Sequence, residues 1–187
     1  MARARQGSGS LPLALEMLAT DHRKVEDLFA MFEAEKEGDD ETKRQIAQRI
    51  CGELTAHAQL EEELFYPWLR ENMDEEDKLE EAYVEHASVK DLIAQIEAAG
   101  AMDETYDAKV KVLSEYVKHH VKEEENEIFT EVQGMQEELD ELGQEMAARK
   151  MDLMEQLGLT DESGSQLNAR EARERGHSQQ AGHRGMR

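Results

Sequence analysis

Apolar residues recur along this chain in alternating steps of three and four positions, the period of one face of an α-helix. Four such stretches follow one another, at about residues 13–37, 40–72, 74–100 and 103–132. Short turns separate them, the first at Gly38 and the third near Gly100. Because short connections favour antiparallel neighbours, the pattern predicts an all-α fold, an antiparallel up-and-down four-helix bundle.

Single residues predict where these helices begin, bend and end. Asp74 and Asp103 are expected to cap the third and fourth helices. Pro67 is expected to bend or stop the second helix near its end. After Gly134 a further helical stretch runs to Gly158, and the pattern leaves open whether it extends the fourth helix or packs on the bundle as a fifth.

Changes in composition divide the chain into four parts. Residues 1–10 are small, polar and basic and are expected to form a disordered leader. The helical bundle occupies 11–133, and a C-terminal helical extension occupies 134–158. From 159–187 the chain is rich in Gly, Ser, Gln and Arg, which predicts a flexible, disordered tail.

Composition and charge narrow the class of protein. Of 187 residues, 39% are hydrophobic and only 5% aromatic, which favours helix over sheet. The net charge of -22 repels phosphate backbones and anionic lipid, so we expect neither a nucleic-acid nor a membrane partner. The single cysteine, Cys51, excludes an internal disulfide, and the apolar run from Leu11 to Leu15 is too short for a signal peptide. A cytoplasmic location is expected.

The candidate chemistry lies within the apolar stripes. Each of the four predicted helices carries one histidine there: His22, His57, His86 and His120. Two of these helices add a glutamate four residues later on the same face, Glu61 and Glu124. A buried carboxylate without a partner is costly, and a metal ion shared with the imidazoles would remove that cost. We therefore predict that these six side chains are metal ligands.

Neighbouring polar residues are predicted to take outer positions. His119 lies about 100° round the helix from His120 and is expected beside the site or at an interface. Tyr83 and Tyr116 each precede a candidate ligand by about one turn and could line a cavity, although ordinary packing is the favoured interpretation. The glutamates beside the stripes are expected to be mostly solvated: Glu62, Glu63, Glu123 and Glu125.

The donor types narrow the choice of metal. No cysteine lies in the pattern, which disfavours zinc-finger and iron–sulfur sites, whereas imidazole with carboxylate suits Fe, Mn or Zn. Four histidines and two glutamates divide between two ions, with two histidines each and carboxylates able to bridge. A solvent-derived oxo or hydroxo bridge would leave room for a small ligand, and two non-haem Fe ions in this arrangement would attract O2, H2O2 or NO.

Four sequence motifs carry a family resemblance. They are Asp21-His22, HAQLEEELFYP at 57–67, Glu85-His86 and HHVKEEENEIF at 119–129. Together, over about residues 15–132, they resemble the hemerythrin-like, or HHE cation-binding, domain. The resemblance implies a four-helix bundle with an oxo-bridged di-iron centre. It also implies that the four stripe histidines are terminal ligands and that the two stripe glutamates bridge the ions.

The chain departs from the oxygen-carrying hemerythrins in two places. Lys90 stands where those proteins have a further histidine ligand, and the last motif offers both Glu124 and Glu125, which leaves open the choice of the second carboxylate. The missing histidine puts reversible oxygen carriage in doubt and leaves the metal pair more open to peroxide. Similar bacterial domains include iron sensors and peroxide-decomposing proteins.

Three functions are therefore carried forward. The first is a di-iron protein that binds or reacts with oxygen, peroxide or nitric oxide, or that senses iron or redox state. The second is a catalase-like enzyme at the same centre, for which the sequence identifies no dedicated general acid. The third is a metal-free helical interaction protein. The sequence does not define the oligomeric state.

Overall fold

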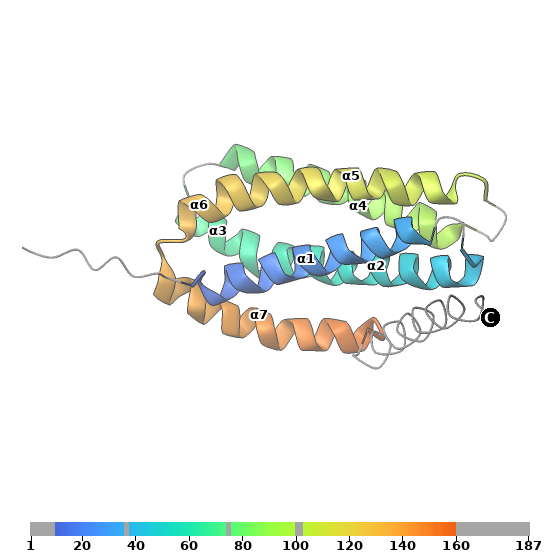
Figure 1. The fold of residues 1–187 in the computed structure, drawn as a ribbon. Coiled ribbons are helices and arrows are strands. Elements are labelled where there is room, and N and C mark those ends of the chain that lie inside the picture. Colours follow the sequence, from blue (N-terminus) through green and yellow to red (C-terminus); the bar gives the residue numbers. More distant parts are fainter. Residues whose placement is uncertain (1–9, 36–37, 74–75, 100–102, 160–187) are drawn as a thin grey trace, which may run out of the picture.

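The described part of the chain is helical throughout. The structure is a computed structural model that describes residues 10–35, 38–73, 76–99 and 103–159. Its elements are, in chain order, α1 (Leu13–Ala34), α2 (Asp40–Leu60), the π-helical turn η1 (Glu61–Phe65), α3 (Tyr66–Asn72), α4 (Glu76–Ala98), α5 (Tyr106–Glu123), the π-helical turn η2 (Glu124–Ile128), α6 (Phe129–Val132) and α7 (Gln136–Gln156). Figure 1 shows long helical rods lying side by side. The all-α prediction is confirmed, with no strand in these residues.

The helix ends follow local sequence signals. Asp39 is the N-cap of α2, and its carboxylate accepts a hydrogen bond from the Thr42 N–H at 3.1 Å. Asp103 similarly accepts from the Thr105 N–H at 2.8 Å, in the turn before α5. α1 ends at Ala34, a few residues before its predicted end. The predicted cap at position 74 and the predicted end at position 100 lie outside the described residues.

Pro67 was expected to bend or stop the second predicted helix, and it does not stop it. The rod continues through α3 to Asn72, and Pro67 lies in the first turn of α3, directly after η1. A π-turn already interrupts the regular ladder of i→i−4 hydrogen bonds. The N–H that proline lacks therefore costs little at this position.

The apolar core consists of two clusters with the polar site between them. One cluster contains Leu18 and Phe65 together with buried residues of α7, and the other contains Val25 and Leu113. On α1, His22 lies between Leu18 and Val25, so the apolar stripe continues on both sides of it. The site is thus enclosed on two sides by packed side chains that exclude water.

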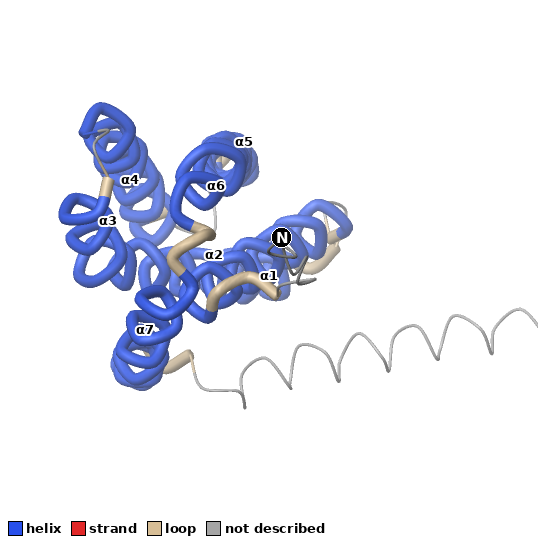
Figure 2. The backbone as a smooth tube through the Cα atoms, turned by 90° about the vertical axis from the view of Figure 1, so that its left-hand side faces the viewer, coloured by secondary structure: helices blue, strands red, loops and turns tan. Residues whose placement is uncertain are grey.

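The stretch after Gly134 packs as a fifth helix, which answers the question that the sequence left open. α7 turns back and lies along α1 and α2, as Figures 1 and 2 both show. Gly143 permits this approach, because a Cβ atom there would lie 2.7 Å from both the Leu13 Cγ and the Ala14 nitrogen. The helix therefore covers one side of the bundle closely.

Parts of the predicted organisation lie outside the described residues. This holds for the predicted leader and tail, except Ser10 and Leu159. Within the described ranges, no helix combines the length and apolar character needed to cross a membrane.

Candidate metal centre

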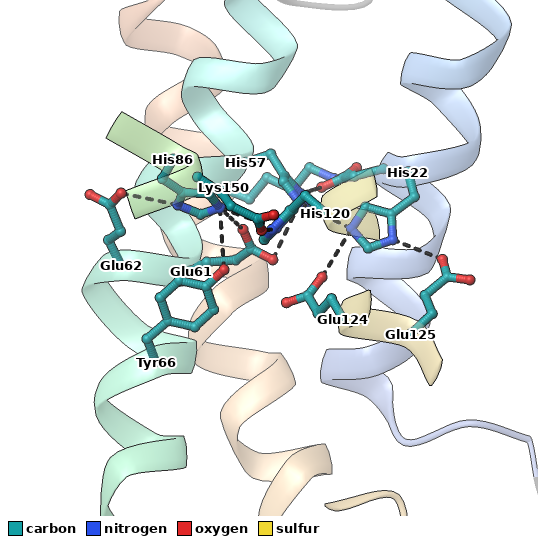
Figure 3. Close-up of polar contacts among 12 residues, drawn as sticks. His22, His57, Glu61, Glu62, Tyr66, His86, His120, Glu124, Glu125 and Lys150 are labelled. Carbon is teal, nitrogen blue, oxygen red and sulfur yellow. Dashed lines mark hydrogen bonds and ion pairs between the residues drawn. The ribbon is translucent and has the colours of Figure 1, made fainter. Parts of the chain in front are cut away.

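Four histidines from four helices meet in the middle of the bundle (Figure 3). His22 of α1 and His57 of α2 face each other with their Nε2 atoms 3.1 Å apart. His86 of α4 and His120 of α5 form a second pair, with Nε2 atoms 3.2 Å apart. All four are buried. Two ring nitrogens this close share either one proton or one cation.

Two buried glutamates complete the polar cluster. Glu61 spans the two histidine pairs, with one oxygen 3.3 Å from the His57 Nε2 and the other 3.3 Å from the His86 Nε2. Glu124 lies 3.2 Å from the His22 Nε2. Their exposed fractions are 0% and 1%, and none of their four carboxylate oxygens accepts a hydrogen bond within the described chain. Buried carboxylates in this state are costly unless a metal cation or a protonated imidazole compensates their charge.

The donor atoms form two overlapping groups, and within each group all ligand atoms lie within 4.8 Å of one another. The first group is His22, His57, Glu61 and Glu124, and the second is Glu61, His86 and His120. Glu61 belongs to both. Imidazole and carboxylate donors suit iron, manganese or zinc. The six predicted ligands therefore form a donor set suited to cation binding, in which Glu61 is shared by the two groups.

The two π-turns bring a further residue onto the ligand face. The Tyr66 N–H bonds to the Glu61 carbonyl oxygen, five residues back, and the Phe129 N–H bonds to that of Glu124 in the same way. The wider turn places Tyr66 on the side of Glu61, and its hydroxyl lies 3.2 Å from the His86 Nε2. Phe129 instead stacks on His22, with ring centroids 6.1 Å apart. A phenol hydroxyl therefore lies beside the His86–His120 pair, and a phenyl ring takes the corresponding place beside His22.

A carboxylate lies at the outer nitrogen of every histidine. These contacts join the Nδ1 atoms of His22, His57, His86 and His120 to Glu125 at 2.8 Å, Asp21 at 3.6 Å, Glu62 at 3.0 Å and Glu85 at 2.8 Å, respectively. The three contacts of 2.8–3.0 Å are hydrogen bonds, which hold the ring orientation and keep Nε2 free to bind a metal, whereas the longer His57–Asp21 contact is an ion pair only. Two of these contacts lie within a helix pair, α1 with α2 and α4 with α5, and the other two join α1 to η2 and α4 to η1.

Cationic side chains in turn balance the outer carboxylates. Arg23 pairs with Glu125, and the Lys90 Nζ lies 2.6 Å from both oxygens of Glu62. Lys150 reaches from α7 to Asp21. Lys90, the residue that replaces a histidine of the oxygen carriers, therefore holds an orienting carboxylate in place.

Burial and mutual repulsion shift the pKa values within the cluster. Burial raises the pKa of Glu61, but His57 and then His86 outweigh it and hold the pKa well below its usual range. Burial, followed by repulsion from Glu61, raises the pKa of Glu124. The pKa of Tyr66 is held well above its usual range by burial and by the nearby carboxylates. A bound cation would relieve this concentration of negative charge.

A small cavity adjoins the four histidines on the side of the second core cluster. Its volume is about 20 Å³, enough for one small molecule such as water. Beyond the histidines its walls are mainly apolar and include Val25, Leu54, Val89 and Val117. An uncharged diatomic molecule or peroxide fits such a space better than a bulky or charged substrate.

The structure corrects two predictions about neighbouring residues. Glu62 and Glu125 were expected to be mostly solvated, but both are partly buried against histidine rings, because adjacent helices supply the rings that they contact. Tyr66, which helical periodicity had not indicated, is the tyrosine at the centre. Tyr83 packs on Tyr66 at 5.3 Å between ring centroids, and Tyr116 is exposed.

The sequence left two questions about adjacent residues: the place of His119 beside His120, and the choice between Glu124 and Glu125 as the second carboxylate ligand. His119 lies exposed beside the centre, near Glu85 and Glu123. Glu124 joins the group of donor atoms, whereas Glu125 contacts the outer nitrogen of His22. The geometry therefore favours Glu124 as the second carboxylate ligand.

A helical bundle with a buried set of histidines and glutamates defines a class of cation-binding proteins. Residues 13–132 match the family described as hemerythrin HHE cation binding domain, and the chain belongs to this family. It is also 30% identical over 156 residues to a protein of Nostoc sp. (strain PCC 7120 / SAG 25.82 / UTEX 2576) named DNA nickase. That alignment covers 82% of this chain but only 44% of the Nostoc protein, so the chain spans less than half the length of this relative. No solved structure matches the chain.

Proposed function

We propose that this protein holds two iron ions in its bundle and uses them to bind or react with a small oxidant, namely O2, H2O2 or NO. The observation that carries this proposal is the buried carboxylate of Glu61, whose two oxygens lie equally far from the two histidine pairs. One carboxylate between two imidazole sets suits two ions better than one.

The ligand sets of the two ions differ in this proposal. His22, His57, Glu61 and Glu124 would hold the first ion, since their donor atoms lie within 4.8 Å of one another. The second has His86 and His120 with the shared Glu61, and Tyr66 lies within reach as a further oxygen donor. When bound, iron supplies the reversible electron transfer that reactions of oxygen and peroxide require. The protein contributes dry walls, fixed imidazoles and the outer carboxylates that orient them.

Peroxide turnover is the second candidate function, and the Tyr66 hydroxyl favours it. The hydroxyl is buried and lies 3.2 Å from the His86 Nε2, beside the candidate ligand atoms. It can donate a hydrogen bond to an oxygen atom held in the centre. Oxygen evolution from added peroxide, followed over many turnovers, separates the enzyme from a binding or sensing protein that reacts once.

A nucleic-acid function is not part of the proposal, although one relative is named DNA nickase. The chain has a net charge of -22, which repels a phosphate backbone. Incubation of the iron-loaded protein with supercoiled plasmid tests this expectation, and conversion to the nicked form above a buffer control would contradict it.

Iron analysis with peroxide kinetics tests the proposal as a whole. Protein produced with added iron is expected to contain about two ions per chain and to absorb in the near ultraviolet. A single zinc ion, or no metal, would leave the metal-free interaction protein as the better account.

A further inference from the structure

An acidic cavity opens beside the centre, between α4 and the rod formed by α5 and η2. Its volume is about 70 Å³. The residues that carry charge or bind metal along its walls include Glu81, Glu85, Glu123, Glu127, Glu124 and His120. The first four are at least partly accessible, and the last two are buried ligands of the centre. The cavity therefore leads from the surface to the centre.

The mouth of this cavity carries a second group of metal-binding side chains. Glu85, His119 and Glu123 offer donor atoms that lie within 4.8 Å of one another. The His119 Nε2 is 3.2 Å from Glu123 and 3.6 Å from the Oε1 of Glu85. The other oxygen of Glu85 contacts the His120 Nδ1 at 2.8 Å. Glu85 thus joins the outer group to the centre.

The inner end of the cavity supplies independent support for a cation path. Glu124 lines the cavity, is 1% exposed, and accepts no hydrogen bond at either oxygen within the described chain. Lys78 also lines the cavity, and its ammonium pairs with Glu131 at 2.5 Å and Glu127 at 3.7 Å. The cavity is thus lined by more carboxylates than cationic side chains.

The opposite half of the bundle carries apolar side chains where this cavity is acidic. The positions there that correspond to Glu81, His119, Glu123 and Glu127 are occupied by Met17, Ala56, Leu60 and Leu64. These apolar residues belong to or pack against the core cluster that includes residues of α7. In Figure 2, α7 lies beside α1 and α2. α7 also places Lys150 on Asp21, the counterpart of Glu85. Apolar side chains and the Lys150 ammonium of α7 therefore cover the half of the bundle formed by α1 and α2. The half formed by α4 and α5 is acidic at the corresponding place.

We propose that Glu85, His119 and Glu123 form a transient binding site for a divalent cation, from which metal passes through the acidic cavity to the centre. One imidazole and two carboxylates are suitable donors for ferrous iron and related ions. Carboxylates that line a cleft also raise the local cation concentration and the rate of association. The inference rests on the proposed two-ion centre, because it describes how that centre is filled.

Metal uptake by the full-length protein tests this path. The protein is freed of metal with a chelator and mixed with Co²⁺, whose visible absorption reports binding, and final content is measured by elemental analysis. The double variant His119→Ala/Glu123→Gln is compared with Glu115→Gln, which removes a carboxylate from an exposed position of the same helix. Circular dichroism confirms that all three proteins have the same helical content.

The double variant is expected to fill roughly tenfold more slowly than wild type and to reach the same final content. The Glu115→Gln control is expected to fill at the wild-type rate. Equal rates for the double variant and wild type, or equal slowing in the control, would overturn the path. A lower final content in the double variant would also overturn it, since His119 and Glu123 would then belong to the centre itself. Wild-type protein that takes up no cobalt would instead refute the two-ion centre.

Discussion

Replacement of Glu61 by glutamine removes one charge from the point where the two metal groups meet. The substitution keeps the volume of a side chain that is 0% exposed, so the packing of η1 is preserved. Glutamine keeps one oxygen and places an NH2 group at the position of the other, so one histidine pair loses the oxygen that lies 3.3 Å from its ring nitrogen, and both pairs lose the negative charge. The change therefore weakens both sites at once, whereas loss of Glu124 removes a donor from the first group only.

The expected loss of metal affinity in Glu61→Gln follows from the role of the carboxylate as a shared ligand. Loss of a partner that only orients a ligand lowers metal affinity about 10–100-fold. A ligand shared by two ions contributes at least as much to each ion, so we expect Glu61→Gln to weaken affinity at least about 100-fold, or about 2.8 kcal/mol. After gel filtration in the presence of a weak chelator, the iron content should fall from about two ions per chain to one or fewer.

Glu63→Gln is the matched control. Glu63 lies two residues further along the same helical rod but pairs with Arg149 on the surface. Its loss removes the same charge and leaves the metal donors untouched. Elemental analysis of both variants and of wild type gives the comparison. Equal iron content in the Glu61 variant and wild type, or equal loss from both variants, would refute the placement of Glu61 between the ions.

Three further predictions concern the surroundings of the centre. Asp21→Asn should lower metal affinity about 10–100-fold in a chelator competition, while Asp27→Asn on the exposed side of the same helix should not; equal affinities would contradict the orienting role of Asp21. Tyr66→Phe should retain the iron but change the rate of reaction with peroxide about tenfold or more by stopped-flow absorbance, and identical kinetics would exclude a part for the hydroxyl. Burial raises the pKa of Cys51 to about 12, so a thiol reagent at pH 8 should label the folded protein at least about 100-fold more slowly than the unfolded chain. Fast labelling of the folded protein would contradict the conclusion that the Cys51 thiol is buried and protonated.

The six candidate ligands could be found from the sequence because the apolar stripes stay in phase up to the π-turns. His57 and His120 lie in α2 and α5, and Glu61 and Glu124 follow as the first residues of the π-turns, so a period of 3.6 residues still places each pair on one face. The same period fails for Tyr66, because η1 widens the turn that separates it from Glu61. A π-turn has no reliable sequence signal, and the tyrosine was therefore missed.

Contacts between helices account for the other differences. Glu62 and Glu125 lie on the flanks of their own helices, where periodicity predicts solvent, and neighbouring helices provide the histidines that they contact. The direction of α7 depends on the turn after Gly134 and on the close approach that Gly143 permits. Neither feature follows from the apolar pattern of one helix. That pattern predicts which face of the helix is buried, but it does not predict which other helix covers that face.

The most direct test of the two-ion centre is the iron content of the purified protein, measured by elemental analysis together with the near-ultraviolet spectrum. The arrangement of two histidine pairs around Glu61 predicts about two iron ions per chain and absorption that disappears when a chelator removes the metal. One ion per chain with the second group empty, or iron-free protein of the same thermal stability before and after iron is added, would contradict it.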